Sequence, residues 1–204
     1  MGLVELVGLV GKGRSLRIIA GSLKGRRLKP PSWDGLRPTS DRLRETLFNI
    51  LAPRIAGARV LDAYAGTGAL GLEALSRGAR SVTFIEQDRR AQALIAENLA
   101  HCGVENAYVI IRSPVAHAFE TLRGSPTSEP FDLVLLDPPY ESEGRRADDP
   151  GAMLAAAGDL LAPGGLLVLE HARRGPVVES AGRLMRSRDV ISGDSVLTFY
   201  EVSF

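Results

Sequence analysis

From Arg59 onward, short β-branched and apolar runs alternate with stretches of helical periodicity, and no other feature restricts the fold as much. Such alternation is typical of a parallel sheet with helices on both faces. The expected strands are 59–64, 81–86, 107–111, 131–136, 166–170, 183–191 and 195–202, and the expected helices are 69–77, 89–102, 115–122, 152–161 and 177–182. Because the connection 192–194 is short, the last two strands should form a hairpin in which one strand is antiparallel to the rest.

Two smaller segments precede this alternation. Residues 1–15 form an apolar leader that is too short to span a bilayer, and residues 16–36 are expected to form a small hairpin with basic side chains outward. A helix should begin after Ser40, which can cap it, and run to about Leu51. We expect residues 37–204 to form one domain.

The charge distribution suggests a polyanionic partner. Seven basic residues and no acidic ones lie between Lys12 and Lys29, whereas the chain from residue 31 carries 18 basic and 23 acidic residues. A cationic hairpin on an acidic body indicates binding to nucleic acid, although a merely solubilising segment is the alternative.

The cysteine and histidine content restricts the cellular compartment and the kinds of site that we expect. The single cysteine, Cys102, rules out an internal disulfide and suits a reducing, cytoplasmic compartment. Three histidines have no paired spacing, so we expect no metal site. We also expect a monomer that does not enter a membrane.

A glycine turn follows the first expected strand. Gly66 and Gly68 would let the backbone approach a nucleotide cofactor, with Thr67 between them. Glu86 ends the next strand and is placed to accept hydrogen bonds from ribose hydroxyls. Up to this point, a nicotinamide dinucleotide and S-adenosylmethionine fit equally well.

Asp62 distinguishes between these two candidate cofactors. A carboxylate beside the glycine turn would repel a pyrophosphate, but it would attract the ammonium group of a methionyl moiety. The sequence therefore favours S-adenosylmethionine, and hence methyl transfer over hydride transfer.

The loop after residues 131–136 reads Asp137-Pro138-Pro139-Tyr140. Two prolines end the strand and stiffen the chain, leaving the carboxylate of Asp137, the carbonyl of Pro138 and the ring of Tyr140. Two fixed acceptors and a stacking ring could hold a planar base through its exocyclic amine. An ordinary turn after a core strand is the alternative.

Several segments together resemble one family, the bacterial 16S ribosomal RNA guanine-N2 methyltransferases of the RsmD type. They are residues 17–21, 24–28, 37–42, 62–71 and 137–140. The glycine turn alone is similar to class I methyltransferases in general, and the hairpin with residues 37–42 narrows the resemblance. It implies a Rossmann-like, seven-stranded sheet and a guanine of 16S rRNA, within the small ribosomal subunit or its precursor, as acceptor.

The resemblance also implies roles for individual residues. Asp62, Gly66, Thr67 and Gly68 would surround the methionyl part of the cofactor, Glu86 would hold the ribose, and Asp137, Pro138 and Tyr140 would hold the base. RNA would be contacted by Arg17, Lys24, Arg26, Arg27, Arg37 and Arg42. Members often carry an acidic residue able to bind the adenine amine where this chain has Arg112-Ser113-Pro114, which leaves Ser113 or a backbone group as a substitute. Near the end, residues 192–195 lack the usual Tyr-Gly pair.

Four other functions remain open at this point, and one of them is a nicotinamide-dependent oxidoreductase. Adenine N6 and a protein glutamine are amines that the same loop could hold, and a non-catalytic RNA-binding assembly factor could share the fold.

Overall fold

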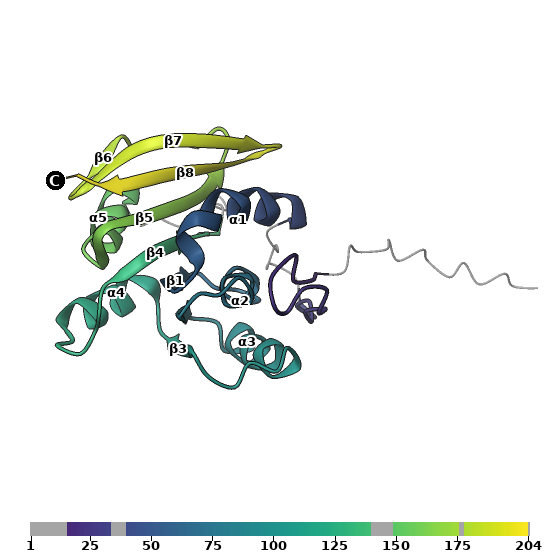
Figure 1. Ribbon diagram of the computed structural model, residues 1–204. Coiled ribbons are helices and arrows are strands. Elements are labelled where there is room, and N and C mark those ends of the chain that lie inside the picture. The colour runs from purple at the N-terminus through teal and green to yellow at the C-terminus, as the bar shows by residue number, and fades with distance from the viewer. Residues whose placement is uncertain (1–15, 34–39, 140–148, 176–177, 204) are drawn as a thin grey trace, which may run out of the picture.

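The computed structural model describes residues 16–33, 40–139, 149–175 and 178–203. Within these ranges eight strands form one sheet in the order β3-β2-β1-β4-β5-β8-β7-β6 (Figure 1). The strands are β1 (Arg59–Ala63), β2 (Ser81–Glu86), β3 (Tyr108–Arg112), β4 (Phe131–Leu136), β5 (Leu161–Ala172), β6 (Ser180–Ala181), β7 (Leu184–Ser192) and β8 (Ser195–Val202). The helices are α1 (Asp41–Ile55), α2 (Ala69–Ser76), α3 (Arg89–His101), α4 (Val115–Gly124) and α5 (Pro150–Gly158).

The predicted mostly parallel sheet is confirmed. β3, β2, β1, β4 and β5 are parallel to their neighbours, whereas β8 is antiparallel to β5, and β7 is antiparallel to β8. The sheet has eight strands rather than seven, because the short β6 adds two residues beside β7.

Helices cover both faces of the sheet. α1, α2 and α3 pack against one face through a core that includes Phe48, Leu72 and Ile95. α4 and α5 cover the other face, where the core includes Phe119 and Leu154. Figure 1 shows the two layers on either side of the sheet. Within the described residues, no helix is long and apolar enough to cross a membrane.

Several predicted element boundaries differ from those of the structure, and two of the differences are large. α1 begins after Ser40, whose Oγ accepts the Leu43 N–H at 3.2 Å as expected, but it continues through Pro53 to Ile55, which packs in the core. The helix expected at 152–161 ends at Gly158, because Leu161 pairs with Phe131 and starts β5.

The helix expected at 177–182 was also wrong. Residues 180–181 form β6, and Gly182 has a φ of +56°, which is incompatible with a right-handed helix. Sheet pairing with β7 therefore overrides the weak helical signal of this segment.

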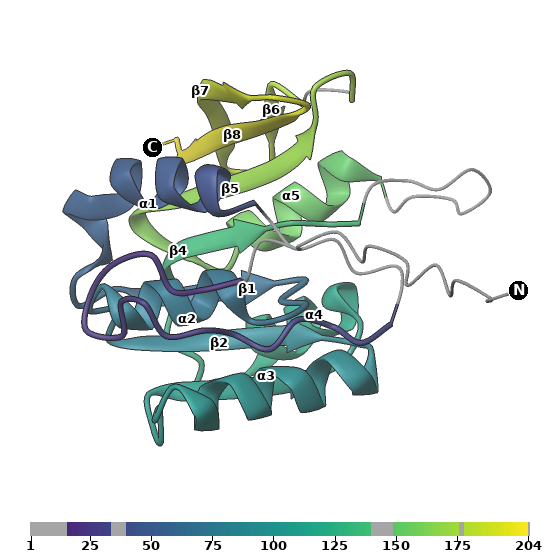
Figure 2. The same ribbon diagram turned by 90° about the vertical axis from the view of Figure 1, so that its right-hand side faces the viewer.

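The N-terminal segment folds back on itself across α2. Arg17 and Arg27 form an isolated antiparallel bridge, and Leu28 N–H donates to Leu16 O at 2.8 Å. Leu16, Ile18 and Leu28 are buried, so this hairpin packs on α2 and α3 and its apolar side chains belong to the same core. Figure 2 shows it lying across the face of α2.

Candidate active site

Sheet register gathers the predicted site residues at one edge. Ala63, which ends β1, pairs with Ile85 on one side and with Leu136 on the other. Glu86 and Asp137 each follow by one residue, so their backbones flank the turn that leaves β1. The carboxyl ends of the parallel strands thus form the edge at which ligands usually bind in such sheets.

The glycine turn connects β1 to α2 at this edge. Gly66 and Gly68 have φ values of +55° and +77°, which other residues adopt only at a cost. Thr67 between them is buried. Gly66 N–H donates to Glu86 Oε2 at 2.9 Å, while Asp88 N–H donates to Glu86 Oε1 at 2.8 Å. Glu86 therefore shapes the turn, and each of its oxygens keeps a second lone pair for a ligand hydroxyl.

Asp62 lies beneath this turn and is 1% exposed. Its Oδ2 accepts the Gly71 N–H at 2.8 Å, but its Oδ1 has no hydrogen-bond partner. Burial raises the pKa of the Asp62 carboxyl to about 7, the hydrogen bond from Gly71 opposes the rise, and the charges of Asp137 and Glu86 add to it.

The charges of Glu86 and Asp137 thus lie close enough to Asp62 to disfavour its ionisation. A buried carboxylate oxygen without a donor is costly, and a nearby cation would remove that cost. The edge is consequently suited to a positively charged ligand and unsuited to a pyrophosphate.

The loop after β4 lies beside the glycine turn. Asp137 and Pro138 are half-buried, and Pro139 is exposed. Asp137 directly follows Leu136, which pairs with Ala63 at the end of β1, and its charge contributes to the raised pKa of Asp62. Tyr140, predicted as the stacking ring, lies outside the described residues.

Ser113 extends the same edge in the other direction. Arg112 pairs with Glu86, and Ser113 follows it, half-buried, with its Oγ donating to Pro114 O at 3.2 Å. Along the edge the order is therefore Ser113, Glu86, the glycine turn and Asp137. The roles predicted for these residues, in the same order, are binding of adenine, ribose, methionyl group and acceptor base, and they remain predictions.

The predicted RNA-contacting cations are spread along the hairpin. Arg17, Lys24, Arg26 and Arg27 are exposed, as is Arg42 in the first turn of α1, and Arg37 lies outside the described residues. Arg26 also donates to Cys102 O at 2.5 Å, which gives it a structural role in docking the hairpin on α3.

Lys24 lies far from the carboxylates. Ser22 N–H donates to Ser76 O at 2.7 Å, and Ser76 ends the helix that Gly68 begins. The hairpin tip therefore sits at the opposite end of α2 from the glycine turn. Near the other end of the hairpin, Lys29 is tied to the glycine-turn side of α3 by the Asn98 side chain.

Sequence reasoning missed the polar groups that hold the hairpin. Glu73 is fully buried on α2, where its carboxylate accepts the N–H groups of Ile19 and Ala20 at 2.7 and 3.0 Å and the Nε–H of Arg77 at 2.7 Å. Asn98 is fully buried on α3. The available signal was the presence of polar residues among the apolar residues of a buried helix face, which also include Ser76 on α2 and Gln92 on α3.

Tyr64 was also missed. It has a φ of +66°, a costly value for an aromatic residue, at the point where β1 enters the glycine turn. Its hydroxyl contacts Met153 Sδ on α5 at 3.3 Å. The strained residue lies directly before the glycine turn, and nothing in the sequence pattern predicted its conformation.

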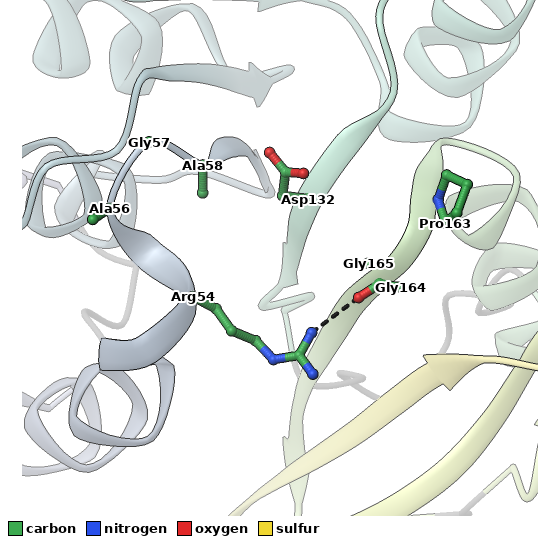
Figure 3. Close-up of a pocket in the computed structure, with 8 residues that line it drawn as sticks. All are labelled: Arg54, Ala56, Gly57, Ala58, Asp132, Pro163, Gly164 and Gly165. Carbon is green, nitrogen blue, oxygen red and sulfur yellow. Dashed lines mark hydrogen bonds between the residues drawn. The ribbon is translucent and has the colours of Figure 1, made fainter.

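A hollow of about 290 Å³ lies elsewhere (Figure 3). Its lining comes from the end of α1 and the starts of β1, β4 and β5, at the opposite edge of the sheet, and Arg54 donates to Gly164 O at 2.9 Å across it. None of the predicted site residues lines it, so it is separate from the carboxylate edge.

Two of the relatives found by sequence comparison are ribosomal RNA methyltransferases by name. Ribosomal RNA small subunit methyltransferase D of Escherichia coli K12 is 48% identical over 130 residues, which are 64% of this chain and 62% of that protein. The Haemophilus influenzae protein of the same name is 38% identical over 165 residues, covering 80% of this chain and 82% of that one. The chain thus spans less than two thirds of the Escherichia coli relative and more of the Haemophilus one.

A solved structure confirms the fold class. The Escherichia coli protein yhhF, which is named as a methyltransferase, superimposes with a TM-score of 0.74 at 35% identity. The match covers 93% of this chain and 99% of that one. The family described as conserved hypothetical protein 95 matches residues 16–201, which is nearly the whole length. The chain therefore belongs to this family, the RsmD family, as its sequence resemblance predicted.

Proposed function

We propose that the protein transfers a methyl group from S-adenosylmethionine to the exocyclic N2 of a guanine in 16S rRNA. The observation that carries this proposal is the gathering of Asp62, Glu86 and Asp137 at one edge of the sheet. The names of the relatives, which specify small-subunit ribosomal RNA, point to the acceptor. The proposal includes a monomer that acts in the cytoplasm on the small ribosomal subunit or its precursor.

The residues present fit this cofactor. S-adenosylmethionine carries an ammonium group and a sulfonium, and when bound it supplies an electrophilic methyl group. The partnerless Oδ1 of Asp62 provides a buried negative site for a cation. Glu86 can accept ribose hydroxyls, the N–H groups of the glycine turn can approach the ligand, and Ser113 lies where the adenine would be held.

Asp137 would bind the amine of the acceptor guanine. The lone pair of the guanine N2 is delocalised into the ring, so the amine is a weak nucleophile until its hydrogens are held by acceptors. The Asp137 carboxylate and the Pro138 carbonyl can accept them, and Asp137 stabilises the positive charge that develops on nitrogen. The methylated amine is then acidic enough to lose its proton to water without a strong base.

The direct test is labelled methyl transfer to unmethylated small ribosomal subunits, free 16S rRNA, DNA and protein, followed by nucleoside analysis. We expect the label in N2-methylguanosine from the small subunits. Label in N6-methyladenosine or in protein would move the proposal to another acceptor. Absence of label in all four, despite cofactor binding, would indicate a non-catalytic assembly factor.

Asp137→Ala tests the catalytic role. We expect turnover to fall by at least ~10²-fold while cofactor affinity changes little, because the lost interaction is with the acceptor amine. Asp132→Ala is the matched control, since Asp132 is exposed at the other end of β4. Near-normal turnover in Asp137→Ala would refute the assignment.

A further inference from the structure

Asn98 lies between the hairpin and the glycine turn. Its Oδ1 accepts the Lys29 N–H at 2.7 Å, and its Nδ2 donates to Thr67 O at 3.0 Å and to Lys29 O at 3.3 Å. The side chain is fully buried. One planar amide therefore joins the end of the hairpin to the turn that would hold the cofactor.

Few side chains could make these contacts. An N–H can only donate and a carbonyl can only accept, so Lys29 and Thr67 fix the orientation of the amide. An aspartate here would place a buried charge against two carbonyl oxygens, and a leucine of similar shape would make none of the three bonds. Asparagine is also a poorer helix former than leucine, so α3 gives up some helix stability for this link.

α3 supports the glycine turn at a second point one turn earlier. A Cβ added to Gly68 would lie 3.4 Å from the Ile95 side chain, so the turn rests directly on this helix. The hairpin has other anchors that do not reach the turn, among them Ser76, whose Oγ accepts the Leu23 N–H at 3.0 Å and donates to Ala20 O. Within the described residues, Asn98 alone hydrogen-bonds both segments.

We propose that Asn98 is a positioning residue that couples the hairpin to the glycine turn, so that rRNA on the hairpin and cofactor at the turn strengthen each other's binding. The inference rests on the proposed function, since it assumes that the hairpin contacts the RNA. Such coupling is reciprocal: the factor by which RNA raises cofactor affinity equals the factor by which cofactor raises RNA affinity.

The test is equilibrium dialysis of labelled S-adenosylhomocysteine against the full chain, with and without saturating unmethylated small ribosomal subunits. In the unsubstituted protein we expect the subunits to raise affinity at least ~5-fold. In Asn98→Leu the increase should fall below ~2-fold. Ser76→Ala is the control, because it loosens the hairpin at the far end of α2 and should keep the full increase.

Hydrogen exchange gives a second readout that requires no RNA. Saturating S-adenosylhomocysteine should slow exchange of the Lys29 amide and of the neighbouring hairpin in the unsubstituted protein. In Asn98→Ser, whose side chain is too short to bridge the two segments, only the glycine turn should gain protection. If Asn98→Leu fails to fold, this variant and the unsubstituted protein still decide the question.

Three results would overturn the inference. Asn98→Leu could keep the full increase in affinity, or Ser76→Ala could lose as much of it as Asn98→Leu does. In the unsubstituted protein, the bound ligand could leave hydrogen exchange of the hairpin unchanged. Failure of the proposed function looks different. In that case the same subunits would receive no methyl group from the unsubstituted protein, while the exchange experiment would still report whether the turn and the hairpin are linked.

Discussion

Asp62 should make the free energy of unfolding of the ligand-free protein depend on pH, and Asp62→Asn should remove this dependence. Its carboxyl is buried, and its pKa is raised from 3.8 to about 7. Between these values the unfolded chain is ionised at this position while the folded chain holds the proton. Folding therefore takes up a proton, and the free energy of unfolding falls as pH rises from about 4 to about 7.

The size of the effect follows from the pKa shift. About three pKa units at 1.36 kcal/mol each give a loss of about 4 kcal/mol, complete once the pH exceeds about 7. The steepest slope is about 1.4 kcal/mol per pH unit. Asp62→Asn keeps an oxygen that can accept the Gly71 N–H but cannot ionise, so it should lack this contribution.

The assay is urea unfolding of the two proteins between pH 4.5 and 8.5. The free energy of unfolding of Asp62→Asn relative to the original should rise with pH up to about 7 and then level off. Parallel pH profiles would refute the reasoning. Calorimetry of cofactor binding in two buffers at pH 6 should also show proton release, because a bound cation would favour ionised Asp62, and the release should nearly vanish at pH 8.5.

Two further predictions concern the hairpin. Gly21 and Gly25 have nearly equal φ values, +85° and +83°, but a Cβ at Gly21 would lie 1.8 Å from Ser76 O whereas nothing lies within 4 Å of one at Gly25. By urea unfolding, Gly25→Ala should cost about 1–2 kcal/mol and Gly21→Ala distinctly more; equal costs would contradict the close approach of Gly21 to α2. Arg27→Glu should weaken rRNA binding and reduce its salt dependence by about one phosphate contact or more, while cofactor affinity stays unchanged. Arg123→Glu on the opposite face is the control, and unchanged RNA affinity in Arg27→Glu would move the binding surface elsewhere.

Sequence patterns over a few residues predicted the features that depend on neighbouring residues, namely the strands, the helix cap and the sheet edge. Alternation of strand and helix predicted the parallel sheet, Ser40 was correctly identified as a helix cap, and parallel register then brings Glu86 and Asp137 to the same edge. The positions of these residues could be predicted because, in a parallel sheet, the end of each strand determines where the next residue lies.

Contacts between distant segments could not be predicted in this way. Glu73 accepts N–H groups 53 and 54 residues away, and Asn98 bonds to Lys29 across 69. Periodicity shows that a residue lies on a buried helix face, but it does not show which segment covers that face. Leu161 illustrates the same limit, since pairing with Phe131 turned a helical pattern into the start of a strand.

The seating of the hairpin along α2 has a consequence for what the enzyme can accept. The hairpin tip and the glycine turn lie at opposite ends of this eight-residue helix, which has about 12 Å of axial rise. If the proposed function is correct, an RNA that contacts both the hairpin tip and the carboxylate edge has to span this distance, which a folded RNA with a fixed shape can do. The protein would then select its substrate by the folded shape of the RNA more than by its base sequence. A short oligonucleotide with the same base sequence would not reach the hairpin and would bind weakly.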